Sequence, residues 1–119
     1  MALEIIGQVR VLVVGDHELT RAAFRCLIES AFRLEVIQEA PHGKEALAAA
    51  MHHQPDVILV DVIAPLAATL ESVRGLREQC GDARIIAVSA DASFQIVNQI
   101  LSAGSLGFVT KNSSPHVLH

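Results

Sequence analysis

The stretch Asp56-Val57-Ile58-Leu59-Val60-Asp61 decides the fold, because four consecutive apolar residues stand between two acids. A β-branched run of this kind predicts a strand that is buried on both faces, as in the middle of a parallel sheet. Val9–Val14 is a second such run, and it leads directly into Gly15 and Asp16. The two runs together predict neighbouring central strands that each end close to an acid.

Three further β-branched runs extend the pattern along the chain, at residues 34–37, 83–88 and 107–109. Between the runs, apolar residues recur at helical spacing around residues 19–31, 46–50, 66–76 and 97–101. Strands that alternate with helices imply right-handed crossovers and a parallel sheet with helices on both faces. We therefore predict an α/β fold, a doubly wound five-stranded parallel sheet in the flavodoxin-like order 2-1-3-4-5.

The helical segment after the first strand shows an apolar stripe at spacing i, i+4, which predicts the face that meets the core. Its members are Leu19, Ala23, Leu27 and Ala31, widened by Phe24 and Ile28. Cys26 falls within this helical pattern and is expected to be a small core residue, whereas Cys80 falls in a loop. No C-x-x-C pair is present, so a reduced, cytoplasmic setting is expected.

Composition limits the class of protein. The 119 residues suit one domain, 1–119, and 51% of them are hydrophobic against 18% charged, which excludes a disordered tail. No apolar run approaches the roughly 20 residues of a membrane span, and the acid Glu4 argues against a signal peptide. The net charge is −4, the nine basic residues are scattered, and Trp and Tyr are absent, so we expect no nucleic-acid surface in this chain.

Polar side chains stand where the predicted strands end. These are Asp16, Asp61, Ser89 and Lys111. In a doubly wound sheet the carboxyl ends of the strands meet at one edge, where ligands bind. Paired carboxylates suit Mg²⁺, and a lysine and a hydroxyl beside them can hold a phosphoryl group. Asp61 could itself attack that group, although Asp61 and Asp16 could also simply cap the segments that follow them.

The sequence resembles the receiver domain of two-component response regulators from Val9 to Leu118, most closely receivers that precede a LuxR-type DNA-binding domain. Five segments in the expected order carry the resemblance. They are Val11-Leu-Val-Val-Gly-Asp-His17, Asp56-Val-Ile-Leu-Val-Asp61, Ala64-Pro65, Val88-Ser89-Ala90 and Ala103-Gly-Ser-Leu-Gly-Phe-Val-Thr-Lys111.

The resemblance implies a role for each residue of the site. Asp61 would be the phosphoacceptor, with Asp16, Asp61 and the backbone carbonyl of Ile63 as ligands of Mg²⁺. Ser89 would bind the phosphoryl oxygens, Lys111 would pair with them, and Ser89 with Phe108 would form the switch. The implied partners are a sensor histidine kinase and a second copy of the receiver, with DNA reached through a domain outside this chain.

The chain departs from the family pattern at two places. Gly15 stands where receivers usually carry a first acid, so Mg²⁺ is expected to bind more weakly. Residues 63–69 lack the usual glycines and acid, and Ile63 cannot orient an attacking water, so slow hydrolysis of a phosphorylated Asp61 is expected. A degenerate receiver that acts in dimerisation or docking without phosphorylation is the alternative.

Other site classes fit less well. A flavin site would need a hydroxyl-rich first loop and stacking aromatics, but that loop is acidic and no Trp or Tyr is present. Val57–Asp61 resembles a Walker B strand but has no phosphate-loop partner, and the six histidines show no zinc spacing. Only five residues follow from Pro115, so we expect a last helix that is cut short and a sheet face left partly uncovered.

Overall fold

The computed structural model describes residues 8–31, 33–90 and 93–110, in which strands and helices alternate from end to end. The strands are β1 (Val9–Val14), β2 (Leu34–Ala40), β3 (Val57–Asp61), β4 (Arg84–Ser89) and β5 (Gly107–Thr110). The helices of this part are α2 (Glu18–Glu29), α3 (Lys44–His53), α4 (Leu66–Gln79) and α5 (Phe94–Ala103). The strands begin and end within a few residues of the predicted runs.

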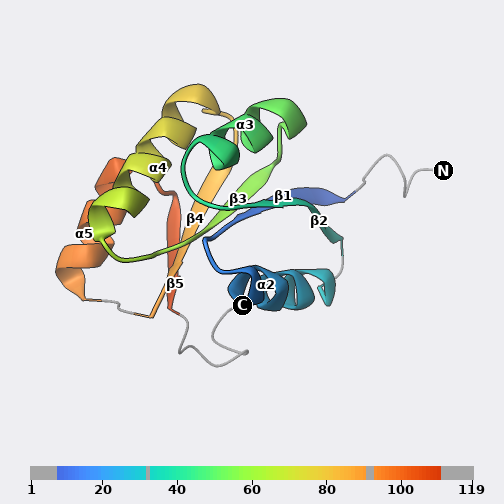
Figure 1. Cartoon of the computed structure of the whole chain (residues 1–119), viewed down its shortest axis with the longest axis horizontal. Helices are drawn as coiled ribbons and strands as arrows, with labels where there is room; N and C mark the ends of the chain where they lie inside the picture. The colour runs from blue at the N-terminus through green and yellow to red at the C-terminus, as the bar shows by residue number, and fades with distance from the viewer. Residues whose placement is uncertain (1–7, 32, 91–92, 111–119) are drawn as a thin grey trace.

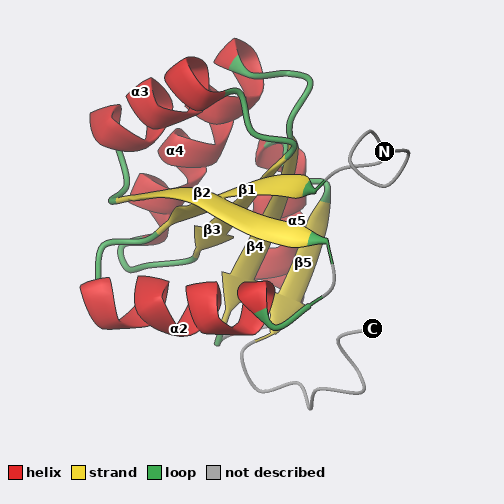
Figure 2. Ribbon diagram, turned by 90° about the vertical axis from the view of Figure 1, so that its right-hand side faces the viewer, coloured by secondary structure: helices red, strands yellow, loops and turns green. Residues whose placement is uncertain are grey.

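The strands form one parallel sheet in the order β2-β1-β3-β4-β5, which confirms the predicted doubly wound topology. Helices α3, α4 and α5 lie on one side of this sheet, and α2 lies on the other (Figures 1 and 2). The edge position of β2 agrees with its more alternating sequence, since an edge strand is less completely covered than a central one. No helix in the described ranges is long and apolar enough to cross a membrane.

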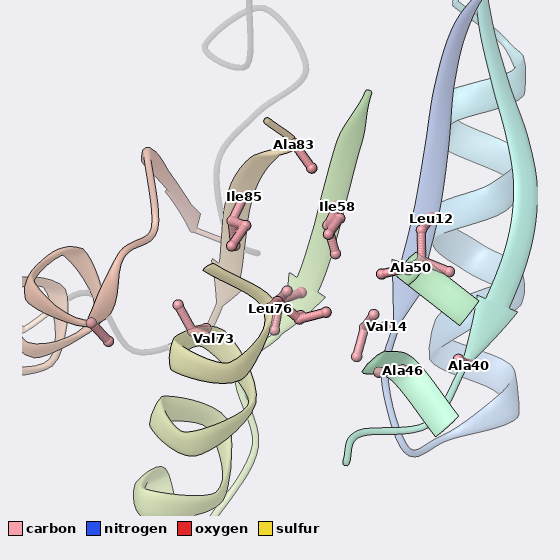
Figure 3. Packing of buried hydrophobic residues seen from close by; sticks show 12 residues of the cluster. Leu12, Val14, Ala40, Ala46, Ala50, Ile58, Val73, Leu76, Ala83 and Ile85 are labelled. Carbon is pink, nitrogen blue, oxygen red and sulfur yellow. The ribbon is translucent and has the colours of Figure 1, made fainter. Parts of the chain in front are cut away.

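Alternation along the central strands builds a core on each side of the sheet. Leu12, Val14, Ile58 and Val60 face α3 and α4, where they pack with Ala46, Ala50, Val73 and Leu76 (Figure 3). Val11, Val13, Val57 and Leu59 face the opposite side and pack with Phe24 and Ile28 of α2. The nearly continuous apolar runs of β1 and β3 therefore serve two cores, as their sequence predicts.

A β-bulge in the pairing of β1 with β2 reorients the end of β2. Val11 pairs with Val36, but Leu12 already pairs with Gln38, so one extra residue is inserted in β2. A shift of one residue exchanges the two faces of a strand. Glu39 is thereby directed toward α2, where it meets Arg21 and Arg25.

The burial of α2 contradicts part of the predicted apolar stripe. Phe24 is buried, at 8% exposure, but Leu19 and Leu27 of the predicted core stripe are 83% and 64% exposed. Cys26 is also exposed, so the expectation that it is a core residue is wrong. The inward face of α2 is centred on Phe24 and Ile28, and the stripe of Leu19 and Leu27 lies to one side of it.

This exposed stripe borders an apolar hollow of about 630 Å³ that runs from α2 to β5. Its floor includes Leu59, Val88 and Val109 of the sheet. Among the described residues no element covers this hollow. The start of a last helix at Pro115 lies outside the described residues.

A matched pair of leucine substitutions tests whether the core residue Leu12 is buried and the α2 residue Leu27 is exposed in solution. Leu12→Ala should lower the free energy of unfolding by about 2–5 kcal/mol, because Leu12 is fully buried and its loss leaves a cavity. Leu27→Ala should cost no more than about 0.5 kcal/mol, because Leu27 is largely exposed. Chemical denaturation followed by circular dichroism measures the free energy of unfolding of both variants. An equal decrease at the two positions would mean that the stripe of Leu19 and Leu27 is covered in solution.

Candidate functional site

The carboxyl ends of β1, β3 and β4 bring three of the predicted site residues to one edge of the sheet. Asp61 is the last residue of β3 and Ser89 the last of β4, and both are buried, at 2% and 3% exposure. Asp61 is paired in register with Val88, the neighbour of Ser89. Asp16 follows β1 by two residues and is exposed. Lys111, the fourth predicted member, lies outside the described residues.

Gly15 lies directly beside Asp61. A Cβ atom on Gly15 would come within 3.2 Å of the Asp61 Cβ and 3.7 Å of its Oδ2. An acid at this position would therefore lie next to Asp61. The carboxylate that Gly15 lacks is thus absent from the centre of the site. The aliphatic part of Arg21 covers the same point, with its Cγ 3.6 Å from the position of that Cβ.

Arg21 also links the site to β2. Its Nη1 donates a hydrogen bond to the carbonyl oxygen of Gly15 at 2.6 Å, and its Nε lies 3.4 Å from Glu39 Oε1. Glu39 also accepts a hydrogen bond from Arg25 Nε, and this bond raises the pKa of the Arg25 guanidinium. The guanidinium of Arg21 thus holds the turn after β1 against the end of β2.

Asp16 binds the loop that precedes α3. Its Oδ1 accepts a hydrogen bond from the backbone N–H of His42 at 2.9 Å. Asp16 is not the N-cap of α2, because that position belongs to His17. His42 in turn places its Nε2 2.7 Å from the backbone carbonyl oxygen of Asp61. A carbonyl only accepts, so this contact places a proton on Nε2 of His42.

The loop after Asp61 is held by Thr69, a fully buried residue in the first turn of α4. Thr69 Oγ1 accepts a hydrogen bond from the N–H of Ile63 at 2.9 Å and donates to the carbonyl oxygen of Ile63 at 3.3 Å. This carbonyl is the predicted third ligand of a cation. Asp61 does not cap α4, whose N-cap is Pro65.

The predicted switch residues, Ser89 and Phe108, lie on the neighbouring strands β4 and β5. Phe108 is half-buried in β5 and pairs in register with Ala87 of β4, two residues before Ser89. A displacement of the end of β4 would therefore be transmitted to β5 directly through the sheet.

The donor set around Asp61 is chemically suited to magnesium. Asp16, Asp61 and the Ile63 carbonyl would supply oxygen ligands, and Mg²⁺ commonly binds one or two carboxylates and keeps several waters. Within residues 8–31, 33–90 and 93–110, no three acidic, histidine or cysteine side chains are grouped as metal ligands. A bound cation would accordingly depend on the Asp16–Asp61 pair and on main-chain and water oxygens.

Sequence reasoning missed three side chains of this edge: Arg21, His42 and Thr69. His42 was one of six histidines without metal-ligand spacing, and nothing in the sequence shows that it reaches the carbonyl of Asp61. Thr69 lies in residues 63–69, the segment in which the sequence departs from the family pattern, and this departure was the signal that could have found it. Arg21 follows Asp16 by five residues, and its contact with Gly15 depends on the turn between β1 and α2.

Comparison with protein families matches residues 11–119 to the response regulator receiver domain. The response regulator GacA of Pseudomonas viridiflava is 34% identical over 105 residues, which cover 88% of this chain and 49% of that protein. UvrY of Escherichia coli K12 is 30% identical over 107 residues, covering 90% of this chain and 49% of that protein. The chain spans about half the length of the curated relatives it matches.

Solved structures show the same architecture. A LuxR-family response regulator from Aurantimonas sp. SI85-9A1 superposes with a TM-score of 0.85 at 30% identity, over 94% of this chain and 80% of that one. The receiver domain of the putative response regulator NarL from Mycobacterium tuberculosis gives a TM-score of 0.80 at 31% identity, over 91% of this chain and 87% of that one.

Magnesium should stabilise the folded chain if the acid pair binds it. At about ten times its dissociation constant, the ion should add about 1.4 kcal/mol to the free energy of unfolding. Thermal unfolding with and without magnesium measures the effect. Asp16→Asn and Asp61→Asn should remove most of this increment, whereas Asp82→Asn, at an exposed loop acid, should retain it. An increment that persists in both site variants would place the ion elsewhere.

Proposed function

The chain belongs to the response regulator receiver domain family, and we propose that Asp61 accepts a phosphoryl group from a sensor histidine kinase. The observation that carries the proposal is the buried carboxylate of Asp61 at the sheet edge, with Ser89 at the end of the next strand and Asp16 beyond β1. Receiver domains are signalling modules, so the chemistry proposed is limited to transfer onto, and hydrolysis from, the domain's own aspartate.

The transfer is a substitution at phosphorus. An oxygen of Asp61 forms the new bond to the phosphoryl group, and the bond from phosphorus to the kinase histidine nitrogen breaks, which leaves an acyl phosphate on Asp61. Magnesium, when bound to Asp16, Asp61 and the Ile63 carbonyl, would supply positive charge against the phosphoryl oxygens. Ser89 would donate a hydrogen bond from its hydroxyl group to one of these oxygens, and Lys111 would form an ion pair with another.

Phosphorylation would change the surface that includes α5 and β5. Movement of Ser89 toward the phosphoryl group makes room for Phe108 to turn inward, and this change favours one of two conformations of the domain. We propose that the altered surface controls association with a second receiver. An output domain outside this chain would convert this association into transcription control.

A second candidate function is a receiver that acts without phosphorylation as a dimerisation or docking module. Gly15 favours it, because the carboxylate next to Asp61 is absent. The two candidates differ in one respect that is directly measurable, the ability of Asp61 to gain a phosphoryl group.

Incubation with acetyl phosphate and magnesium should add the mass of one phosphoryl group to the chain. Intact mass spectrometry is the suitable readout, because the chain contains no Trp for a fluorescence assay. Asp61→Ala is the blank, and Gly15→Asp restores the missing acid. An adduct only in the Gly15→Asp variant would support the phosphorylation-independent module, and an adduct in Asp61→Ala would place the modification elsewhere.

Once formed, the acyl phosphate should be long-lived, because the side chain of Ile63 cannot hydrogen-bond an attacking water. Ile63→Asn should accelerate the loss of the adduct by roughly tenfold, the effect of one hydrogen bond made in the transition state. Ile63→Val is the matched control and should leave the rate unchanged. Equal lifetimes for the asparagine variant and the wild type would exclude this role of Ile63.

A further inference from the structure

Two side chains fix the main chain immediately after Asp61. His42 comes from the loop before α3 and donates from Nε2 to the Asp61 carbonyl oxygen at 2.7 Å. Thr69 comes from the first turn of α4 and accepts from the N–H of Ile63 at 2.9 Å. We refer to His42 and Thr69 together as the loop clamp.

We propose that Thr69 is a positioning residue that holds the peptide group of Ile63, including its carbonyl oxygen, in place before any cation binds. The inference rests on the proposed function, since it assigns that carbonyl to the cation beside Asp61. It goes beyond that function because it gives a role to a residue that touches neither the cation nor the phosphoryl group.

The position of Thr69 makes it an effective anchor. Its side chain is fully buried, so its hydroxyl does not exchange partners with bulk water. The segment from Val62 to Pro65 lies between β3 and α4, and the N–H of Ile63 takes its partner from Thr69. The N–H of Ile63 is part-buried, so the loss of this partner would cost free energy, and the bond therefore constrains the loop.

The distances indicate that the hydroxyl positions the carbonyl without competing for it. The bond from the Ile63 N–H to Oγ1 is 2.9 Å long, whereas the contact from Oγ1 to the Ile63 carbonyl is 3.3 Å long. A carbonyl oxygen has two lone pairs, and a hydroxyl proton can rotate to suit its surroundings. A cation can therefore take the carbonyl while the shorter bond to the N–H remains.

His42 completes the clamp from the other side. Its bond fixes the carbonyl of Asp61, and Thr69 fixes both polar groups of Ile63, so only Val62 separates the two anchored residues. Ordering the loop after Asp61 when a cation binds costs conformational entropy. This cost is smaller if the loop is already anchored before binding. The clamp thereby offsets part of the affinity that Gly15 removes from the cation site.

Amide hydrogen exchange of the cation-free chain gives the first test. The Ile63 amide should be protected in the wild type and in Thr69→Ser, which retains the hydroxyl. In Thr69→Val, which has the same shape without the hydroxyl, exchange should be about fivefold faster, the equilibrium factor of one ordinary hydrogen bond. An unprotected Ile63 amide in the wild type overturns the proposal without the use of any variant.

Isothermal titration with magnesium chloride gives the second test. The dissociation constant should be about fivefold weaker for Thr69→Val and unchanged for Thr69→Ser. His42→Leu should weaken it similarly, whereas His42→Gln, which can still donate to the Asp61 carbonyl, should restore it. The two His42 variants keep the magnesium titration decisive for the loop clamp if Thr69→Val fails to fold. Unchanged or tighter binding by the variants without the hydrogen bond overturns the proposal.

The two readouts separate this inference from the proposed function. If the wild type gains no phosphoryl adduct but Thr69→Val alters amide exchange and magnesium binding as expected, the proposed function fails and the clamp stands. If the adduct forms while neither readout responds to Thr69→Val, the clamp fails and the proposed function stands. If wild-type chain binds no magnesium, the role of the clamp toward the cation is overturned.

Discussion

The burial of the Asp61 carboxylate is the constraint on which the rest of the site depends. Asp61 is only 2% exposed at the end of a central strand, and a buried carboxylate is costly unless polar or positive groups surround it. The strand order β1-β3-β4 places the turn after β1 on one side of Asp61 and β4, which ends at Ser89, on the other. The fold and the chemistry are thus consequences of the same strand arrangement.

Gly15 changes the charge around the buried Asp61 carboxylate. A Cβ atom on Gly15 would lie so close to Asp61 that an acid there would add a third carboxylate to Asp16 and Asp61. In this chain the space is bordered by the stem of Arg21, whose guanidinium is tied to Gly15 and Glu39. The site therefore lacks the carboxylate expected at position 15, and the side chains of Arg21, His42 and Thr69 hold its main chain.

The sequence predicted the strand order and the convergence of Asp16, Asp61 and Ser89, because continuous β-branched runs that alternate with helical segments are visible along the chain, and because parallel strands place their carboxyl ends at one edge of the sheet. It failed where the outcome depended on how elements pack. The i, i+4 stripe of α2 could not show that the helix is rotated toward Phe24, which leaves Leu27 and Cys26 exposed. The contact between His42 and Asp61 joins residues 19 positions apart and has no sequence pattern.

The most direct test of the account is ¹⁹F and ¹H–¹⁵N NMR of the natural chain with beryllium fluoride and magnesium, a stable mimic of the phosphorylated state. The account predicts a bound fluoride signal that requires magnesium and is absent in Asp61→Ala, together with shifted amides at Asp61, Ile63 and Ser89. A folded wild-type chain that gives no bound signal at saturating magnesium would contradict it, because Asp61 would then lie in a site that cannot hold a phosphoryl group.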